Sequence, residues 1–298
     1  MEETPNKQKA GFIAILGAPN AGKSTLLNNM VGQKISITSK KPQTTRNRIL
    51  GLVTRSNCQY IFIDTPGIHR VKGALNAKIV DAALSSIGDA DVILFIADAF
   101  RSDLRSENIL LTRLNNINKP VICALNKIDI IEKTPLLFLI EKHSKDHSFK
   151  SIIPISAKHG TGVDILFSEI EKFMPESPML FPEDAVTDVS QRFIAAEIIR
   201  EKVFRYTGEE IPYAVAVTIE SFKETSKIDK IDATIHVEKK SQKGIIIGKK
   251  GSKLVQIGTA ARKEIEEMTG KRAYLKLFVH VEKNWSNNAK ALLEFGYL

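Results

Sequence analysis

Short apolar segments alternate with longer amphipathic ones through the first half of the chain. Apolar runs without a helical period predict buried strands at Phe12–Leu16, Asp91–Ala97, Pro120–Leu125 and Ser151–Ile155. Stretches with a helical period predict helices at Asn76–Ile87, Asp103–Leu114, Glu132–Asp146 and Val163–Phe173. Arg48–Thr54 and Gln59–Asp64 predict two strands joined by a turn. This alternation predicts an α/β domain whose mostly parallel sheet is covered on both faces and binds its ligand beyond the carboxyl ends of the strands.

The pattern changes after a connector. Met174–Thr187 holds three prolines and has no helical period, which predicts a linker, with Leu180 and Phe181 packed against one domain. Beyond it the pattern predicts a helix, two period-two strands, a glycine turn, a helix, a strand and a last helix, at Asp188–Arg205, Pro212–Phe222, Ile228–Glu238, 244–252, Leu254–Met268, Ala273–Val281 and Asn284–Leu293. We therefore expect a first domain at 1–174, a linker at 175–187 and a smaller α+β domain at 188–298.

The charge balance favours a polyanionic partner. The 298-residue chain carries a net charge of +9, which suits nucleic acid or an acidic membrane surface. Cys58 and Cys123 lie in apolar runs and are expected to be buried thiols in a reducing compartment. The first ten residues are polar, and no apolar run approaches the roughly 18 residues of a membrane span. We expect a cytoplasmic protein, with peripheral membrane contact left open.

The segment Gly17–Ser24, GAPNAGKS, matches the phosphate-binding pattern G-x-x-x-x-G-K-[ST] at every fixed position. It lies between a predicted strand and an amphipathic stretch that places Leu26, Leu27 and Met30 on one side, which is the context the motif requires. Glycines allow backbone N–H groups to close around phosphate oxygens at the positive end of a helix. We expect Lys23 to reach the β- and γ-phosphates and Ser24 to bind Mg²⁺.

Two later segments suit the sensing of a γ-phosphate. Residues 33–47 form a polar stretch without a period, long enough to be a functional loop, and contain Thr44 and Thr45. The strand that ends at Asp64 continues into Thr65-Pro66-Gly67. An aspartate at the end of a strand beside the P-loop strand suits a water-mediated Mg²⁺ contact. The N–H of Gly67 is then free to donate to the γ-phosphate.

Two further motifs predict selection of guanine. Asn126-Lys127-Ile128-Asp129 follows one predicted strand, and Ser156-Ala157-Lys158 follows the next. The carboxylate of Asp129 can accept hydrogen bonds from N1–H and the N2 amine of guanine, whereas adenine offers neither donor. Lys127 can lie along the base, and Asn126 can brace neighbouring loops. A backbone N–H at Ala157 can donate to guanine O6.

The turn Gly248-Lys249-Lys250-Gly251 predicts an RNA-binding site. A GXXG loop between two helices clamps the backbone of about four single-stranded nucleotides. Six lysines and no acidic residue occur between Lys239 and Lys253. The expected RNA-binding residues are Gly248, Lys249, Lys250, Gly251 and Lys253. The element order resembles the αββααβ, type II variant of the KH fold.

The ordered motifs GAPNAGKS, QTTRN, DTPG, NKID and SAK resemble those of the translation-factor-related P-loop GTPases. The resemblance implies a Mg²⁺-dependent GTPase with two switch loops, at 34–46 and 67–75. By motif alignment we assign the switch Mg²⁺ ligand to Thr45, with Thr44 as the alternative. The implied catalytic residues are Lys23, Thr45 and Gly67, and the implied metal ligands are Ser24, Thr45 and, through water, Asp64. The implied GTP-binding residues are Gly17, Ala18, Pro19, Asn20, Ala21, Gly22, Lys23, Ser24, Thr25, Thr44, Thr45, Asp64, Thr65, Pro66, Gly67, Asn126, Lys127, Asp129, Ser156, Ala157 and Lys158.

One position departs from the pattern of Ras-like enzymes. Where they carry a glutamine that orients the attacking water, this chain has Ile68, which is apolar. His69 follows it and is one alternative for positioning water. Backbone groups or a monovalent cation are others, because Asn20 matches the position that helps to hold K⁺ near the phosphates in related GTPases. Slow intrinsic turnover is expected in each case.

The whole chain, including the ending VEKNWSNNAKALLEFGYL, is similar to the bacterial Era family of ribosome-assembly GTPases. The resemblance implies GTP-dependent binding near the 3′ end of 16S rRNA, a role in assembling the small (30S) ribosomal subunit, some association with the inner membrane, and a monomer. Two alternatives stay open. One is a GTP-binding regulator at a membrane surface, and the other is an RNA-binding factor that holds GTP or GDP with negligible hydrolysis.

Overall fold

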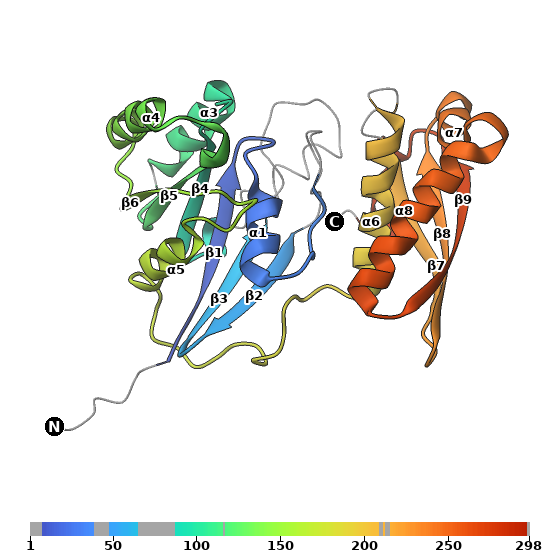
Figure 1. Ribbon diagram of the computed structural model, residues 1–298, viewed down its shortest axis with the longest axis horizontal. Coiled ribbons are helices and arrows are strands. Elements are labelled where there is room, and N and C mark those ends of the chain that lie inside the picture. Colours follow the sequence, from blue (N-terminus) through green and yellow to red (C-terminus); the bar gives the residue numbers. More distant parts are fainter. Residues whose placement is uncertain are drawn as a thin grey trace. The chain divides into compact units, whose positions relative to one another are not determined.

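The computed structural model describes residues 8–38, 48–64, 87–115, 117–208, 211 and 215–296. The described chain forms two compact units, and the boundary between them falls after Asp188 (Figure 1). The first unit includes residues 8–36, 48–64 and 87–188, and the second includes the described residues from Val189 onward. Each unit has its own sheet and its own hydrophobic core.

In the described part of the first unit, six strands form one sheet in the order β2-β3-β1-β4-β5-β6. All neighbouring pairs are parallel except β2 and β3, which are antiparallel. The strands are β1 (Lys9–Gly17), β2 (Ile49–Arg55), β3 (Cys58–Asp64), β4 (Val92–Asp98), β5 (Val121–Asn126) and β6 (Ser151–Pro154). The predicted mostly parallel sheet is therefore confirmed, and each predicted strand lies within a few residues of its expected place.

Helices cover both faces of this sheet. They are α1 (Lys23–Val31), α3 (Leu104–Leu114), α4 (Lys133–Asp146) and α5 (Val163–Glu171). Leu110 and Leu114 of α3 share a buried cluster with Phe95 of β4, and Leu139 of α4 packs against it. Tyr60 and Phe62 of β3 instead meet Phe167 of α5 edge to face, on the opposite side. The predicted helix Asn76–Ile87 lies almost wholly outside the described residues.

The linker is bound along the first unit. Gln59, which is fully buried, accepts hydrogen bonds from the N–H groups of Leu180 and Phe181 at 2.8 and 2.9 Å. Further along, Thr187 Oγ1 donates to the Leu50 carbonyl, and Asp188 Oδ1 accepts from the Leu50 N–H. Phe181 packs against the β2–β3 cluster as expected, whereas Leu180 is 47% exposed, so that expectation is wrong.

The second unit has the element order predicted for the smaller domain. Its described strands β7 (Val215–Lys223), β8 (Ile228–Val237) and β9 (Arg272–Val281) form a mixed sheet, antiparallel between β7 and β8 and parallel between β8 and β9. Its helices are α6 (Gln191–Thr207), α7 (Lys240–Ile247), α8 (Ser252–Thr269) and α9 (Ala289–Glu294). Figure 1 shows α6 and α8 lying across one face of the sheet. The αββααβ order is therefore confirmed.

Two predicted helix boundaries are wrong, each for a local reason. The helix expected to begin at Asp188 begins at Gln191, because Ser190 accepts from the Phe193 N–H as its cap while Asp188 bonds to β2. The last helix is interrupted at Asn288, whose side chain accepts from the N–H groups of Lys290 and Ala291 and starts α9. Trp285 precedes that break, is fully buried, and meets Phe295 edge to face at 5.3 Å.

Candidate functional site: nucleotide and nucleic-acid sites

The phosphate-binding loop connects β1 to α1 at the carboxyl edge of the sheet. Its turn depends on Gly22, where φ is +103° and an added Cβ would collide with Asn126 Nδ2. Helix α1 begins at the next residue and buries Leu26, Leu27 and Met30, as its sequence predicts. The N-terminus of α1 is thereby aimed along the loop, which favours a bound anion.

Lys23 is buried with its ammonium group inside this loop. Its Nζ donates to the Gly17 and Ala18 carbonyls at 3.0 and 2.9 Å, and the residue is only 7% exposed. Burial lowers the pKa of Lys23 from 10.5 to about 8, and the carboxylate of Asp64 opposes that shift. A buried cation with two carbonyl partners is ready to pair with a phosphate.

The carboxylate of Asp64 connects Ser24, at the end of the phosphate loop, to Ser36, in the segment after α1. Its Oδ2 accepts from Ser24 Oγ at 2.9 Å and from Ser36 Oγ at 2.8 Å, and the residue is fully buried. The hydroxyl and the carboxylate expected at the metal site are thus adjacent. Ser36 was missed by sequence analysis because it lies in a polar loop without a motif. Asn28 positions this loop, since its Oδ1 accepts from the Ile35 and Ser36 N–H groups.

Asn126 connects the three loops that the sequence assigned to one nucleotide. Its Nδ2 donates to the Ala21 carbonyl of the phosphate loop at 2.8 Å. Its Oδ1 accepts from the N–H groups of Lys127 at 2.8 Å and Ala157 at 2.9 Å. The side chain is 3% exposed, so these bonds are shielded from water. The structure therefore gives Asn126 the bracing position that the sequence suggested.

Lys127 and Asp129 are each held by a side chain from another strand or loop, and only the partner of Lys127 lies outside the predicted motifs. The ammonium of Lys127 forms an ion pair with Asp98, the last residue of β4, which sits beside Asn126 in the parallel register. Ser156 Oγ donates to Asp129 Oδ1 at 2.7 Å, and this bond is the main cause that lowers the pKa of Asp129. Asp129 is therefore ionised at neutral pH and can accept from two donors on one base.

Several predicted site residues cannot be placed. Thr44, Thr45, Thr65, Pro66, Gly67, Ile68 and His69 lie outside the described residues. The contacts given above bring together the phosphate loop, the end of β3 and the loops after β5 and β6. Pro19 and Asn20 belong to the same loop, and Asn20 is exposed with a φ of +63°. Thr25 follows Ser24 in α1, and Lys158 follows Ala157 as an exposed residue.

The glycine turn of the second unit connects α7 to α8. Gly248 and Gly251 have φ values of +71° and +81°, and an added Cβ at Gly248 would lie 2.7 Å from Lys253 Cβ. Lys249 and Lys250 are exposed between them. The turn thus presents two cations on a backbone that glycine permits to bend sharply.

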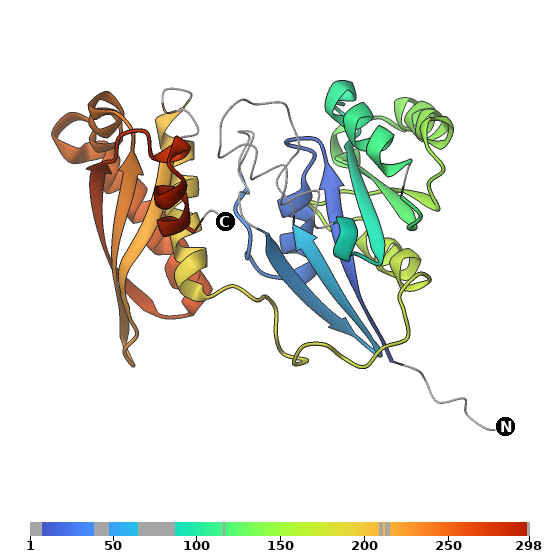
Figure 2. The same cartoon turned by 180° about the vertical axis from the view of Figure 1, so that it is seen from behind.

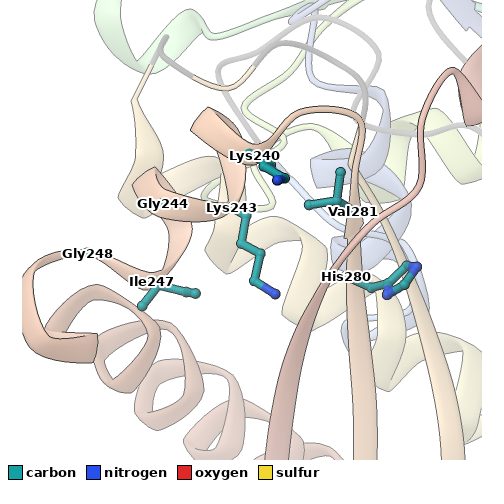
Figure 3. A pocket seen from close by; sticks show the side chains of 7 residues that line it. All are labelled: Lys240, Lys243, Gly244, Ile247, Gly248, His280 and Val281. Atoms are coloured by element: carbon teal, nitrogen blue, oxygen red, sulfur yellow. The ribbon is translucent and has the colours of Figure 1, made fainter.

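A hollow of about 610 Å³ adjoins this turn (Figure 3). Its lining comes from α7 and the turn on one side and from the end of β9 on the other: Lys240, Lys243, Gly244, Ile247, Gly248, His280 and Val281. Apolar side chains and two lysines line the same space, which suits a base next to a phosphate. His280 was missed by sequence analysis because only the fold brings β9 beside α7.

Comparison with known proteins identifies both domains. The family model described as 50S ribosome-binding GTPase matches residues 12–127, and the KH domain model matches residues 210–286. GTPase Era of Geotalea uraniireducens is 50% identical over 295 residues, which are 99% of each chain. GTPase Era of Ruminiclostridium cellulolyticum is 46% identical over 290 residues, 97% of each chain.

Two solved structures match the chain along almost its whole length. A single-residue variant of Aquifex aeolicus Era bound to GDP and aluminium fluoride has a TM-score of 0.92 and 43% identity, covering 97% of this chain and 99% of the other. Era in complex with MgGDPNP and nucleotides 1506–1542 of 16S ribosomal RNA has a TM-score of 0.92 and 44% identity, with the same coverage.

The fold and the two sites define a P-loop GTPase whose nucleotide-binding domain is followed by a KH domain. The match to curated relatives along the whole chain is more specific than this class. The chain belongs to the Era family of GTPases, and its enzymatic reaction is the hydrolysis of GTP to GDP and phosphate.

Proposed function

We propose that this chain is a Mg²⁺-dependent GTPase that binds 16S rRNA through its KH domain and acts as a nucleotide-controlled assembly factor for the small ribosomal subunit. One observation carries the proposal: the same chain contains two sites of different chemistry. A hollow lined by lysines adjoins the GKKG turn, and Asn126 ties together the loops expected to bind a guanine nucleotide. The proposal is supported by the relative that was crystallised with MgGDPNP and a fragment of 16S rRNA.

The donor set beside the phosphate loop fits Mg²⁺. Ser24 offers a hydroxyl oxygen, and Asp64 offers a carboxylate to which Ser24 is already hydrogen bonded. Mg²⁺ prefers such hard oxygen ligands and uses few of them from the protein, because it retains water and phosphate oxygens. In this proposal Ser24 binds the ion directly, Asp64 binds it through water, and Thr45 completes the set. When bound there, Mg²⁺ would offset the negative charge of the β- and γ-phosphates.

Base selection by Asp129 gives the sharpest test of the nucleotide site. In Asp129→Asn, an amide N–H would replace the carboxylate oxygen that is expected to accept from the N2 amine of guanine. The remaining oxygen of the side chain would still accept from Ser156. We expect affinity for GTP to fall by about 10⁴-fold, the loss typical of a site built around one hydrogen-bonding group. Affinity for xanthosine triphosphate, which has a carbonyl at that position, should rise. Equal binding of GTP and ATP by the unaltered protein would refute the assignment.

The RNA assignment is tested by crosslinking the full-length protein to total cellular RNA and sequencing what is attached. We expect reads concentrated at the 3′ end of 16S rRNA, with more of them in GDPNP than in GDP. Because coupling between two ligands is reciprocal, that RNA should change GTP affinity by the same factor. Pelleting with anionic liposomes, in competition with RNA, distinguishes the membrane alternative. None of the described helices is both long and apolar enough to cross a bilayer.

Hydrolysis itself needs a water-positioning group that the sequence does not supply at Ile68. We propose slow intrinsic turnover that depends on K⁺ held near Asn20, whose side chain lies in the exposed part of the phosphate loop. Single-turnover hydrolysis should be faster in K⁺ than in Na⁺ at equal ionic strength, and Asn20→Ala should remove the difference. Equal rates in the two salts would contradict the K⁺ proposal. Rates measured with and without 30S subunits test whether turnover is negligible on its own.

A further inference from the structure

The open face of the second sheet carries a row of exposed aromatic and basic side chains on β9. Alternate residues of this strand face away from α6 and α8: Arg272, Tyr274, Lys276, Phe278 and His280. Tyr274 is 57% exposed and Phe278 is 47% exposed. Their sequence neighbours Ala273 and Val279 are buried on the helical side. Figure 2 shows the sheet from this open side.

We propose that this row, here called the β9 platform, is a second single-stranded RNA site on which bases stack after leaving the hollow beside the GKKG turn. The inference rests on the proposed RNA-binding function for the nature of its ligand. It adds a separate set of residues, Tyr274, Lys276 and Phe278, which do not line the hollow.

The chemistry of the platform favours RNA over an apolar partner. Lys276 lies between the two rings in the sequence, and its Nζ is 4.8 Å from the centre of the Phe278 ring. The neighbouring strand adds Lys230 directly opposite Tyr274 in the parallel register, and Arg272 lies at the start of the row. Asp232, opposite Lys276, is the acidic residue on the open side of this part of β8, since Asp229 is buried on the helical side. Rings that alternate with cations bind bases and phosphates together, as single-strand binding surfaces do.

The platform is continuous with the hollow. His280 and Val281 line the hollow, and His280 faces the same side of β9 as Phe278, two residues away. Phe278 and Tyr274 are four residues apart, about 13 Å at the rise of a strand. That separation exceeds the roughly 3.4 Å between stacked neighbouring bases of one strand. The two rings would therefore hold bases that are not stacked on each other, as in an extended strand.

At the end of the open face nearest the hollow, the neighbouring strand β8 is already covered. Phe295, just after α9, lies 4.3 Å from the ring of His236, and His236 pairs in register with His280. His236 Nε2 is also within hydrogen-bonding distance of Thr218 Oγ1, at 2.8 Å. The C-terminal segment thus packs at the His236 end, while Tyr274 and Phe278 remain accessible.

The test compares two RNAs with the full-length protein by fluorescence anisotropy. One is a labelled five-nucleotide RNA from the 3′ end of 16S rRNA. The other is the same RNA extended by seven uridines, made in a 5′ and a 3′ version. We expect one of the extensions to tighten binding by about tenfold or more, because each stacked base contributes measurably to affinity. In the double variant Tyr274→Ala and Phe278→Ala, that gain should disappear while affinity for the short RNA is unchanged.

Control variants separate stacking from folding. Tyr274→Phe retains the ring and should keep the gain, and Phe138→Ala, on an exposed ring of α4, should have no effect. The proposal is overturned if neither extension tightens binding, or if the double variant weakens both RNAs equally. Replacement of Lys249 and Lys250 by alanine should weaken the short RNA as well. The proposed function fails if the protein does not bind the short RNA, or if replacing Lys249 and Lys250 leaves its affinity for that RNA unchanged. In either case, the difference in affinity between the extended and the short RNA still tests the β9 platform.

Discussion

The nucleotide site and the proposed RNA site are built in opposite ways. Lys23, Asp64 and Asn126 are buried, and each is fixed by hydrogen bonds to a segment distant in the sequence or to the loop around it. Lys249 and Lys250 are exposed and follow one another in a single turn, where backbone conformation rather than side-chain bonding sets their placement. The first site is preorganised by a buried network, and the second is a charged turn beside a hollow.

The difference determines how each site responds to change. A buried polar group that loses its partner costs about 1–3 kcal/mol, and a buried charge costs more. An exposed lysine that contacts phosphate contributes a smaller amount that salt screens. Substitutions in the nucleotide site should therefore have large effects that are independent of salt. Those in the KH turn should have moderate effects that depend on it.

After Asp129→Asn, the largest effect is expected for Lys23→Ala in the full-length protein. It removes the only ammonium inside the described phosphate loop, and the loss of one partner of a buried charge pair costs about 3–5 kcal/mol, or roughly 1000-fold in affinity. GTP and GDP binding should be abolished at micromolar concentrations, as measured by calorimetry. RNA binding by the same protein should persist in the absence of nucleotide. If RNA binding also disappears, nucleotide binding and RNA binding are not carried by separate sites.

Asn126→Ala should have the next largest effect. It leaves the Ala21 carbonyl and the Ala157 N–H without their buried partner, so the phosphate loop and the loop after β6 are no longer tied. We expect GTP affinity to fall by about 10- to 100-fold, and the free energy of unfolding to fall by about 1–3 kcal/mol. Asn29→Ala, at an exposed position of α1, is the matched control. A variant with unchanged GTP affinity would show that the bracing bonds have no functional role.

A smaller effect is expected when Lys249 and Lys250 are both replaced by alanine. If each contacts one phosphate, the slope of log affinity for RNA against log salt should fall by roughly 2. The matched control is the double alanine variant of Lys142 and Lys145, two exposed lysines of α4. Their replacement lowers the net charge by the same two units. Equal loss of RNA affinity in both double variants would mean that net charge, not the turn, governs binding.

The smallest effect is a pH dependence of nucleotide binding. Burial lowers the pKa of Lys23 to about 8, whereas a bound phosphate favours the ammonium form. Below pH 8 the group is already charged, so binding takes up no proton. Above pH 8 binding is coupled to proton uptake, and affinity should fall by up to about tenfold per pH unit. Calorimetry of GDP binding between pH 7.5 and 9, in buffers of different ionisation enthalpy, measures that uptake, and its absence would contradict the assignment.

The sequence predicted most of the fold because strands and helices here are long and strongly patterned. It also predicted that Asn126 braces loops, since the motifs fix which strand ends they follow. It did not reveal Ser36, Asp98 or Gln59, because each acts through one hydrogen-bonded or ionic partner that is distant along the chain. It placed the start of α6 at Asp188 because two nearby polar residues, Asp188 and Ser190, both suit a helix cap. Only contact with β2 decides between them.

By itself, the sequence determined the class of this protein, because the order and spacing of its motifs predict a P-loop GTPase domain followed by a KH domain. The tertiary structure alone decided how individual groups are held, because burial lowers the pKa of Lys23 to about 8 and Ser156, from the loop after β6, donates to the carboxylate of Asp129. The tertiary structure also decided that β9 presents rings and cations on an open face beside the hollow. Alternation along a strand shows which residues share a face, but only the packing of helices on one side shows which face is exposed.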